Sequence, residues 1–270
     1  MAIQELLFES HDFLLALACA QPRTLAMLAT LPIFHSQMVP GMLRLSVATC
    51  ICLLVAPALM PEVQAHHGPG QIVLLMVKEA FIGFALGFAL ALPFWAFEAV
   101  GFLIDNQRGA SIAATLNPLT GNDSSPLGIL FNQAFIVFFL VSGGLLLVLG
   151  LLYDSFRLWP VFHWSPTLQA DTVPLLLAQL DRLMSLCMLY GAPVIVAMFL
   201  AEVGLALVSR FVPQLQVFFL AMPIKSALAL LVLIIYSATL FDLGRDQIDS
   251  LVHIVPFLHQ QWSATPGVPR

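Results

Sequence analysis

The sequence has 270 residues, of which 60% are hydrophobic and 9% are charged, and its formal net charge at pH 7 is −5. Soluble globular domains carry about 25% charged residues, so this composition excludes an ordinary soluble domain. The absence of a basic run gives no sign of a surface that binds nucleic acid. We expect a membrane protein whose apolar surface faces lipid or other apolar chains.

Acidic residues and no basic cluster precede the first apolar stretch, so we expect no cleavable signal peptide. Polar or Pro/Gly-rich connectors separate six apolar stretches, at residues 13–34, 43–60, 72–104, 127–153, 173–209 and 215–241. Backbone groups in lipid must be satisfied within their own segment, which predicts helices rather than open strands. The expected fold is an all-α membrane protein with about six long apolar helical segments, several of them broken or hairpin-like.

Two of these stretches, 72–104 and 173–209, are far longer than the ~20 residues that a simple span needs. As single helices they would each reach about 50 Å, against a hydrocarbon core about 30 Å thick. Either they protrude, or they break at Pro93 and at Gly191 with Pro193; the sixth stretch contains Pro223. Broken helices at membrane depth need protein or water to satisfy the freed backbone, which predicts packing in an assembly or along a path.

Five charged residues are flanked by long apolar runs: Lys78, Glu79, Glu98, Glu202 and Lys225. Charges inside a membrane are costly, so we expect them to pair or to face a polar interior, the alternative being a place at the headgroup level. Lys78 and Glu79 are neighbours, so we expect their side chains to diverge on a helix and not to pair with each other. Gly83 and Gly87 form a Gly-x-x-x-Gly step that permits close helix approach.

Catalytic patterns are lacking in the sequence, which contains neither a phosphate-binding Gly-x-x-x-x-Gly-Lys loop nor a Gly-x-Ser-x-Gly elbow. We interpret Ser142-Gly143-Gly144 as a small-residue packing patch and His66-His67 as a solvated loop. The four cysteines, Cys19, Cys50, Cys52 and Cys187, are predicted to be buried packing thiols. We therefore expect no enzyme activity, no metal and no cofactor.

Two polar islands stand out among the apolar stretches. Residues 101–111 read Gly-Phe-Leu-Ile-Asp-Asn-Gln-Arg-Gly-Ala-Ser, and residues 210–218 read Arg-Phe-Val-Pro-Gln-Leu-Gln-Val-Phe, followed by Met222-Pro223-Ile224-Lys225-Ser226. With Pro32-Ile33-Phe34, Val39-Pro40, and Asp154-Ser155 before Pro160, they resemble the FliR/SctT family of type III secretion export subunits. Gln216 stands where many members have Asn. We favour an injectisome member over a flagellar one because of Gln216 and the overall resemblance.

The resemblance implies a subunit of the export gate in the bacterial inner membrane. It implies a FliP/SctR-like part at 1–170 that includes a plug loop at 105–126, a FliQ/SctS-like hairpin at 171–245, and a polar tail at 246–270. The implied partners are FliP/SctR-like, FliQ/SctS-like and FlhB/SctU-like subunits, the inner rod, unfolded export substrates and membrane lipid.

Candidate plug residues are Asp105, Gln107, Arg108, Gly109, Ser111, Asn117, Pro118 and Gly121, and candidate assembly residues are Glu98, Glu202, Arg210, Pro213, Gln214, Pro223 and Lys225. Small, polar, turn-forming residues suit a plug that packs when closed and moves when substrate passes. Asp105 and Arg108, three apart, are placed to pair if that turn is helical. Lys225 is placed to meet Glu202 or the carbonyls that Pro223 frees. A secondary transporter for a small solute and an intramembrane hydrolase remain the alternatives.

Overall fold

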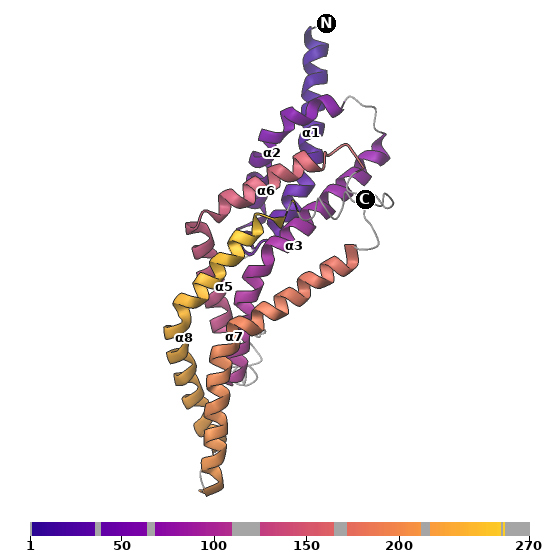
Figure 1. The fold of residues 1–270 in the computed structure, drawn as a ribbon. Coiled ribbons are helices and arrows are strands. Elements are labelled where there is room, and N and C mark those ends of the chain that lie inside the picture. The colour runs from indigo at the N-terminus through magenta and orange to yellow at the C-terminus, as the bar shows by residue number, and fades with distance from the viewer. Residues whose placement is uncertain are drawn as a thin grey trace. The chain divides into compact units, whose positions relative to one another are not determined.

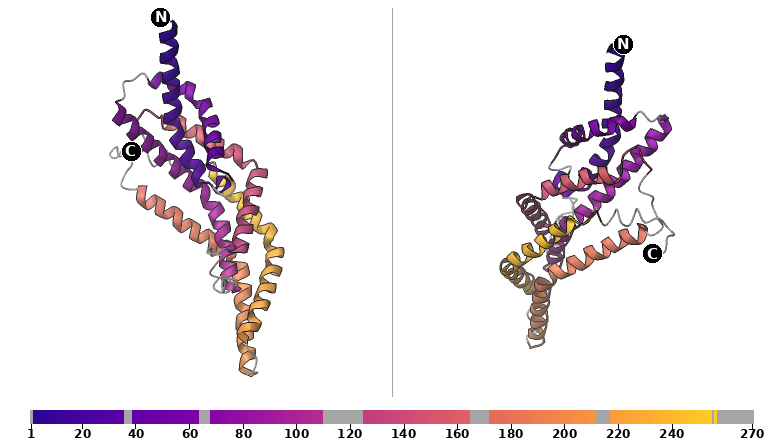
Figure 2. Two further views of the ribbon diagram at one scale, coloured as in Figure 1. Left: turned by 180° about the vertical axis from the view of Figure 1, so that it is seen from behind. Right: turned by 45° about the horizontal axis from the view of Figure 1, so that its top comes forward.

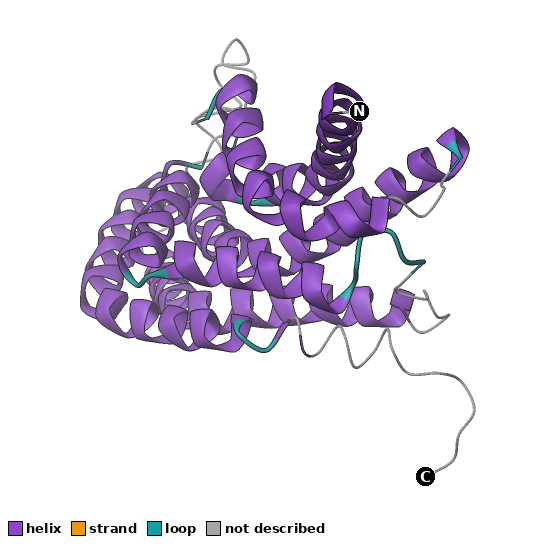
Figure 3. Cartoon of the chain, turned by 90° about the horizontal axis from the view of Figure 1, so that it is seen from above, coloured by secondary structure: helices purple, strands orange, loops and turns teal. Residues whose placement is uncertain are grey.

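The computed structural model describes residues 2–35, 39–63, 68–109, 125–164, 172–211, 217–254 and 256. The regular structure in these residues is entirely helical, which confirms the all-α prediction (Figure 3). In chain order (Figure 1) the elements are α1 (Ala2–Thr30), the 3₁₀ turn η1 (Pro32–Phe34), α2 (Gly41–Val63), α3 (Pro69–Gln107), α5 (Pro126–Val141), α6 (Gly144–Leu158), α7 (Thr172–Phe211) and α8 (Val217–Leu251).

Five of these helices are long and apolar enough to cross a membrane, and the pair α5 and α6, which is bent at a short break, provides a sixth candidate. The apolar spans are Ser10–Thr30, Gly41–Val63, Gly70–Gln107, Leu177–Phe211, Leu220–Leu251 and the pair Pro126–Val141 with Gly144–Leu158. Each predicted apolar stretch therefore corresponds to one helix or to this one pair.

The long helices do not break at their prolines. α3 continues through Pro93, α7 through Pro193 and α8 through Pro223, so of the two alternatives for the overlong stretches, a break at proline is wrong. Figure 2 shows α7 as one helix that changes direction along its length. Proline removes a single N–H from the ladder and crowds the preceding turn, and membrane helices accommodate this by bending.

The chain does bend between α5 and α6, at Ser142 and Gly143. Gly143 has φ 81°, a left-handed conformation that glycine adopts without the steric cost of a Cβ. Ser142 N–H still donates to Phe138 O (2.9 Å), and Leu146 N–H donates to Gly143 O (3.0 Å), so the first helix ends where the next begins. Ser142 and Gly143 are exposed and Gly144 is buried, so within this chain the predicted packing patch is limited to Gly144.

Two compact units make up the chain, residues 1–91 with 143–176 and 250–270, and residues 92–142 with 177–249. These units do not test the expected division at residue 170, which concerned resemblance to partner subunits and stays a prediction. In the first unit, a Cβ on Gly83 would run into the backbone of Arg23, and one on Gly87 would run into Thr30 Oγ1 and Met27 O. The predicted close approach at this Gly-x-x-x-Gly step is confirmed, and the partner helix is α1.

Aromatic rings fill the core of the second unit. Phe97 stacks on Phe135 with ring centroids 4.2 Å apart, and Phe94 meets Phe135 edge-on at 5.0 Å. These rings join α3 to α5, where a Cβ on Gly101 would also collide with the backbone at Gly128. Between α3 and α5, aromatic rings therefore pack at Phe97, and one turn further along α3 the two helix backbones touch at Gly101 and Gly128.

The cysteines divide into buried and exposed. Cys19, Cys52 and Cys187 are buried as predicted, but Cys50 is exposed, so the prediction for that residue is wrong. Two residues apart on α2, Cys50 and Cys52 point to nearly opposite faces, and Cys52 takes the inner one, where its sulfur lies 3.2 Å from Thr24 Oγ1.

Candidate functional site

The carboxylate of Asp105, in the last turn of α3, joins the two ends of the predicted plug segment. Its Oδ1 accepts hydrogen bonds from Arg108 Nε and lies 2.7 Å from Arg108 Nη2, which confirms the predicted pair. Its Oδ2 accepts from Ser125 Oγ (2.6 Å) and from the backbone N–H of Leu127 (3.0 Å). Asp105 is buried, and its negative charge lies at the first turn of α5, where free N–H groups favour an anion.

Ser125 completes this arrangement as the N-cap of α5. Its side chain accepts a hydrogen bond from Gly128 N–H at 2.9 Å while it donates to Asp105. Arg108 and Ser125, which lie on either side of the segment 110–124, thus both bind one carboxylate. Gly109 turns the chain out of α3 with φ 80°, and Gln107 is exposed at the end of that helix. Ser111, Asn117, Pro118 and Gly121 lie outside the described residues.

The predicted assembly residues occupy the hairpin of α7 and α8 and the outer face of α3. Lys225 Nζ donates to Glu202 Oε2 at 2.6 Å, so of the two partners proposed for Lys225 the structure places Glu202 there. Glu98 accepts from Asn132 Nδ2 at 3.0 Å. Arg210 and Pro223 are exposed, while Pro213 and Gln214 fall outside the described residues.

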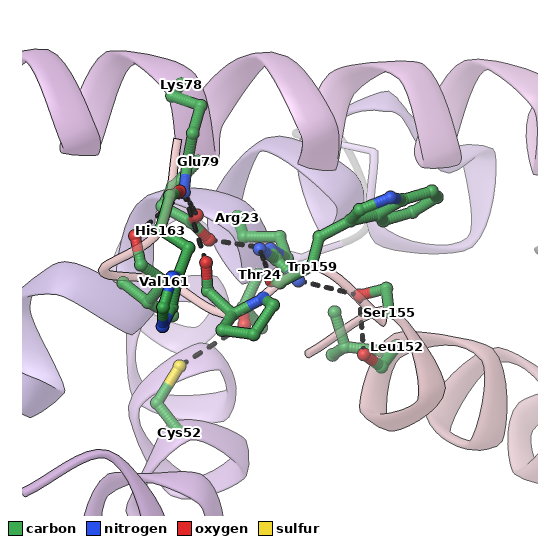
Figure 4. A network of polar contacts seen from close by, with 11 residues as sticks. Arg23, Thr24, Cys52, Lys78, Glu79, Leu152, Ser155, Trp159, Val161 and His163 are labelled. Atoms are coloured by element: carbon green, nitrogen blue, oxygen red, sulfur yellow. Dashed lines mark hydrogen bonds and ion pairs between the residues drawn. The ribbon is translucent and has the colours of Figure 1, made fainter. Parts of the chain in front are cut away.

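A buried ionic network in the first unit was not among the predicted sites (Figure 4). Arg23 of α1 is fully buried, and its Nε donates to Glu79 Oε2 of α3 at 2.6 Å. Its Nη1 donates to Ser155 Oγ of α6 (3.2 Å) and its Nη2 to the carbonyl of Trp159 (2.7 Å). The guanidinium also lies 4.3 Å above the ring of Phe156.

Lys78 extends this network to the segment that follows α6. Its ammonium donates to the carbonyls of Pro160 (3.3 Å), Val161 (2.7 Å) and His163 (2.7 Å). The same nitrogen lies 2.9 Å from Glu79 Oε1, so the expectation that Lys78 and Glu79 do not pair is wrong. The side chains of Lys78 and Glu79 leave α3 about 100° apart. The lysine side chain is nevertheless long enough for its ammonium to reach both the carbonyls of residues 160–163 and the Glu79 carboxylate.

The network contains two cations and one carboxylate, so carbonyl oxygens must balance the surplus positive charge. Those oxygens follow the C-terminal end of α6, where the helix dipole is negative and favours cations. Arg23 and Lys78 therefore cap α6 and fix the chain from Trp159 to His163 against α1 and α3. Arg23 has the same sequence signal as the five predicted charges, since it interrupts an apolar stretch. Its partners lie 56 and 132 residues away, and main-chain carbonyls have no sequence signature.

Together the helices and these internal contacts define a multi-pass helical membrane protein in which several charges of the apolar helices are held by partners in the same chain. Among the described residues, no group of three or more His, Cys, Asp or Glu could hold a metal ion. The chain belongs to the family of bacterial export proteins, family 1, whose model matches residues 14–251.

Similarity to individual proteins extends over most of the chain. It is 40% identical over 216 residues to Yop proteins translocation protein T of Yersinia pestis, covering 80% of this chain and 83% of the relative. It is 34% identical over 238 residues to the surface presentation of antigens protein SpaR of Shigella flexneri, covering 87% and 90%. To the flagellar biosynthetic protein FliR of Bacillus subtilis it is 29% identical over 230 residues, covering 83% and 86%.

These matches confirm the resemblance that the polar islands carry. The chain is a multi-pass membrane subunit of a bacterial type III secretion export apparatus, a family of membrane components that are not enzymes. The two alternatives, a solute transporter and an intramembrane hydrolase, are thereby set aside.

Proposed function

We propose that this subunit helps to form the protein-conducting pore of the export gate in the bacterial inner membrane, and that the segment at 105–126 closes it. The observation that carries the proposal is the Asp105 carboxylate, which receives hydrogen bonds or ion pairs from both sides of the segment. A plug needs a fixed base as well as a movable tip, because the fixed base returns the tip to the same closed position after a substrate has passed.

The partners that we propose are FliP/SctR-like, FliQ/SctS-like and FlhB/SctU-like subunits, with the inner rod beyond them and unfolded proteins as the substrates. Large apolar side chains are exposed along α2, α7 and α8, among them Met42, Leu54, Phe199 and Ile234. Such surfaces support contact with lipid and with neighbouring membrane helices. The 40% identity to Yop proteins translocation protein T, against 29% to the flagellar FliR, supports an injectisome apparatus.

Deleting residues 110–121 tests the plug. We expect cells that express the deleted chain with the rest of the apparatus to become permeable to a small dye that intact cells exclude. Cells with the unaltered chain serve as the control, and immunoblots of membranes must show equal amounts of both proteins. Unchanged dye uptake with an assembled apparatus would refute the plug and leave the family membership untouched.

A further inference from the structure

Helices α3 and α5 contact each other at successive levels along one face of each helix. Starting from the segment 110–124, the contacts are Asp105 with Ser125 and Leu127, Gly101 with Gly128, Glu98 with Asn132, and Phe94 with Phe135 and Phe139. The contacting residues of each helix are three or four apart, which keeps them on one face. The two helices therefore run antiparallel, and Asp105 lies at the end of their contact.

The two glycines determine how close α3 and α5 come. A Cβ on Gly101 would lie 2.5 Å from Gly128 N and 2.6 Å from Gly128 Cα, backbone atoms that move only if α5 moves. Carbon atoms in contact normally lie about 3.5–4.0 Å apart, so a side chain at residue 101 must drive the helices apart by roughly 1 Å. Glycine lowers the stability of a helix interior, so a glycine on both sides of one contact indicates that the close approach itself is required.

The carboxylate of Asp105 can reach α5 only at this helix separation. Its Oδ2 lies 2.6 Å from Ser125 Oγ and 3.0 Å from the backbone nitrogen of Leu127. Hydrogen bonds of these two kinds extend to about 3.0 and 3.2 Å, so a separation larger by roughly 1 Å breaks both. Gly101 is one helical turn from Asp105 on the same face of α3, so a displacement at the glycine also displaces the carboxylate.

We propose that Gly101 and Gly128 are positioning residues of the gate: their backbone contact brings Asp105 within reach of α5 and so sets the closed position of the segment 110–124. Neither glycine has a side chain that could touch a substrate, and both act through the Asp105 carboxylate. This inference rests on the proposed function, because it requires that the segment closes the pore.

Hydrogen exchange in the assembled apparatus tests the positioning step. Gly101→Ala should speed exchange of the Leu127 amide hydrogen at least about fivefold, because its acceptor moves out of reach. Adding Asp105→Glu lengthens the acidic side chain by one carbon–carbon bond of about 1.5 Å and should restore the protection. Asp105→Glu alone should weaken the protection, since the longer side chain does not fit the unaltered spacing. The proposal is wrong if Asp105→Glu has the same effect with and without Gly101→Ala.

Dye uptake by cells carrying the same variants tests the effect on closure, with equal amounts of assembled apparatus shown by copurification. Gly101→Ala should raise uptake at least about fivefold, and the double variant with Asp105→Glu should return it towards the unaltered level. A general loss of packing does not produce this reversal, because a second substitution in a weakened core adds further damage. Failure of Asp105→Glu to lower the uptake of the Gly101→Ala cells would overturn the proposal.

Two further glycines complete the series. A Cβ on Gly128 would lie 3.0 Å from Ser125 Oγ, a side-chain atom, and 3.1 Å from Glu98 O, so Gly128→Ala should act in the same direction but more weakly. It provides the same test with Asp105→Glu if Gly101→Ala does not fold. Gly204→Ala, in α7 of the same unit, is the control, because a Cβ there meets no atom of the described residues within 4 Å. It should change neither exchange nor uptake.

The two proposals fail in different ways. If deletion of residues 110–121 leaves dye uptake unchanged in cells with an assembled apparatus, the proposed function fails and this inference fails with it. If that deletion raises uptake while Gly101→Ala, at equal abundance, changes neither uptake nor exchange at Leu127, only the positioning role of the glycines fails.

Discussion

Arg23 links three helices and the segment after α6 through one side chain. It pairs with Glu79, donates to Ser155 and to the Trp159 carbonyl, and lies over the ring of Phe156. A buried charge is tolerated only when its hydrogen-bonding groups are satisfied, and removing one partner leaves the others uncompensated. A single guanidinium can satisfy all these acceptors because its donors form a planar fork, which an ammonium lacks.

Replacing Arg23 should therefore destabilise the protein strongly. We expect Arg23→Met to lower the free energy of unfolding by about 3–5 kcal/mol, because Glu79 keeps a buried charge with only Lys78 beside it. Unfolding in mixed detergent, followed by circular dichroism, measures the change. Arg182→Met is the matched control, since Arg182 is exposed and bonds Gln247 at 3.0 Å, and it should change the midpoint little. Equal effects of both substitutions would contradict this account of the network.

Asp105 is the second residue on which several groups depend. Asp105→Ala leaves the Ser125 hydroxyl and the Leu127 N–H without their acceptor, at a cost of at least about 2 kcal/mol in stability. Asp105→Asn keeps one acceptor oxygen and should lose less. The same detergent unfolding ranks the two variants, and dye uptake by cells carrying them reports whether the plug base has loosened. An Asn variant less stable than the Ala variant would be inconsistent with the hydrogen-bond pattern.

At the scale of elements, hydropathy identified the helices because each apolar stretch must satisfy its own backbone in lipid. The helix breaks predicted at proline were wrong, because Pro93, Pro193 and Pro223 each remove one N–H without ending a helix. The real bend at Gly143 lies within an unbroken apolar stretch, so no drop in hydropathy marks it. At the candidate site, local spacing predicted the Asp105–Arg108 pair, whereas the contact with Ser125 crosses 20 residues and depends on how α3 meets α5.

The close contact between α1 and α3 depends on glycines of α3 that have no Cβ. Gly83→Ala would force a methyl group into the backbone of Arg23, which cannot move as a flexible side-chain end can. We expect a loss of about 1–3 kcal/mol, typical of overpacking, in the same unfolding measurement. Gly150→Ala in α6 is the control, because a Cβ there meets nothing within 4 Å, and it should be neutral or slightly stabilising. A harmless Gly83→Ala would show that α1 and α3 lie further apart.

At the scale of the whole molecule, the described residues include three buried charges, Arg23, Glu79 and Asp105, and many exposed large apolar side chains. Most charged residues within the apolar stretches are bonded to another residue of the same chain, while large apolar side chains cover the outside of α7 and α8. This distribution is the reverse of a soluble protein and suits a protein that is surrounded by lipid and by other subunits.

The chain expressed alone should differ from the chain expressed with the rest of its apparatus. In mild detergent we expect it to copurify with several other membrane subunits in the second case and to aggregate or be degraded in the first. Native gel electrophoresis with mass spectrometry measures both. A stable monomer that transports a solute across vesicles unaided would contradict the assignment to an export complex.

The distance along the chain between Arg23 and its partners has a consequence for biogenesis. Arg23 leaves the ribosome 56 residues before Glu79 and 132 residues before Ser155. At about 5–20 residues per second, the nascent first helix waits roughly 3–11 s for its counterion. During that interval α1 carries an unneutralised guanidinium, which costs about 2.5–3.5 kcal/mol at the centre of a membrane helix. We therefore expect the first helix to enter the bilayer more favourably together with α3 than alone.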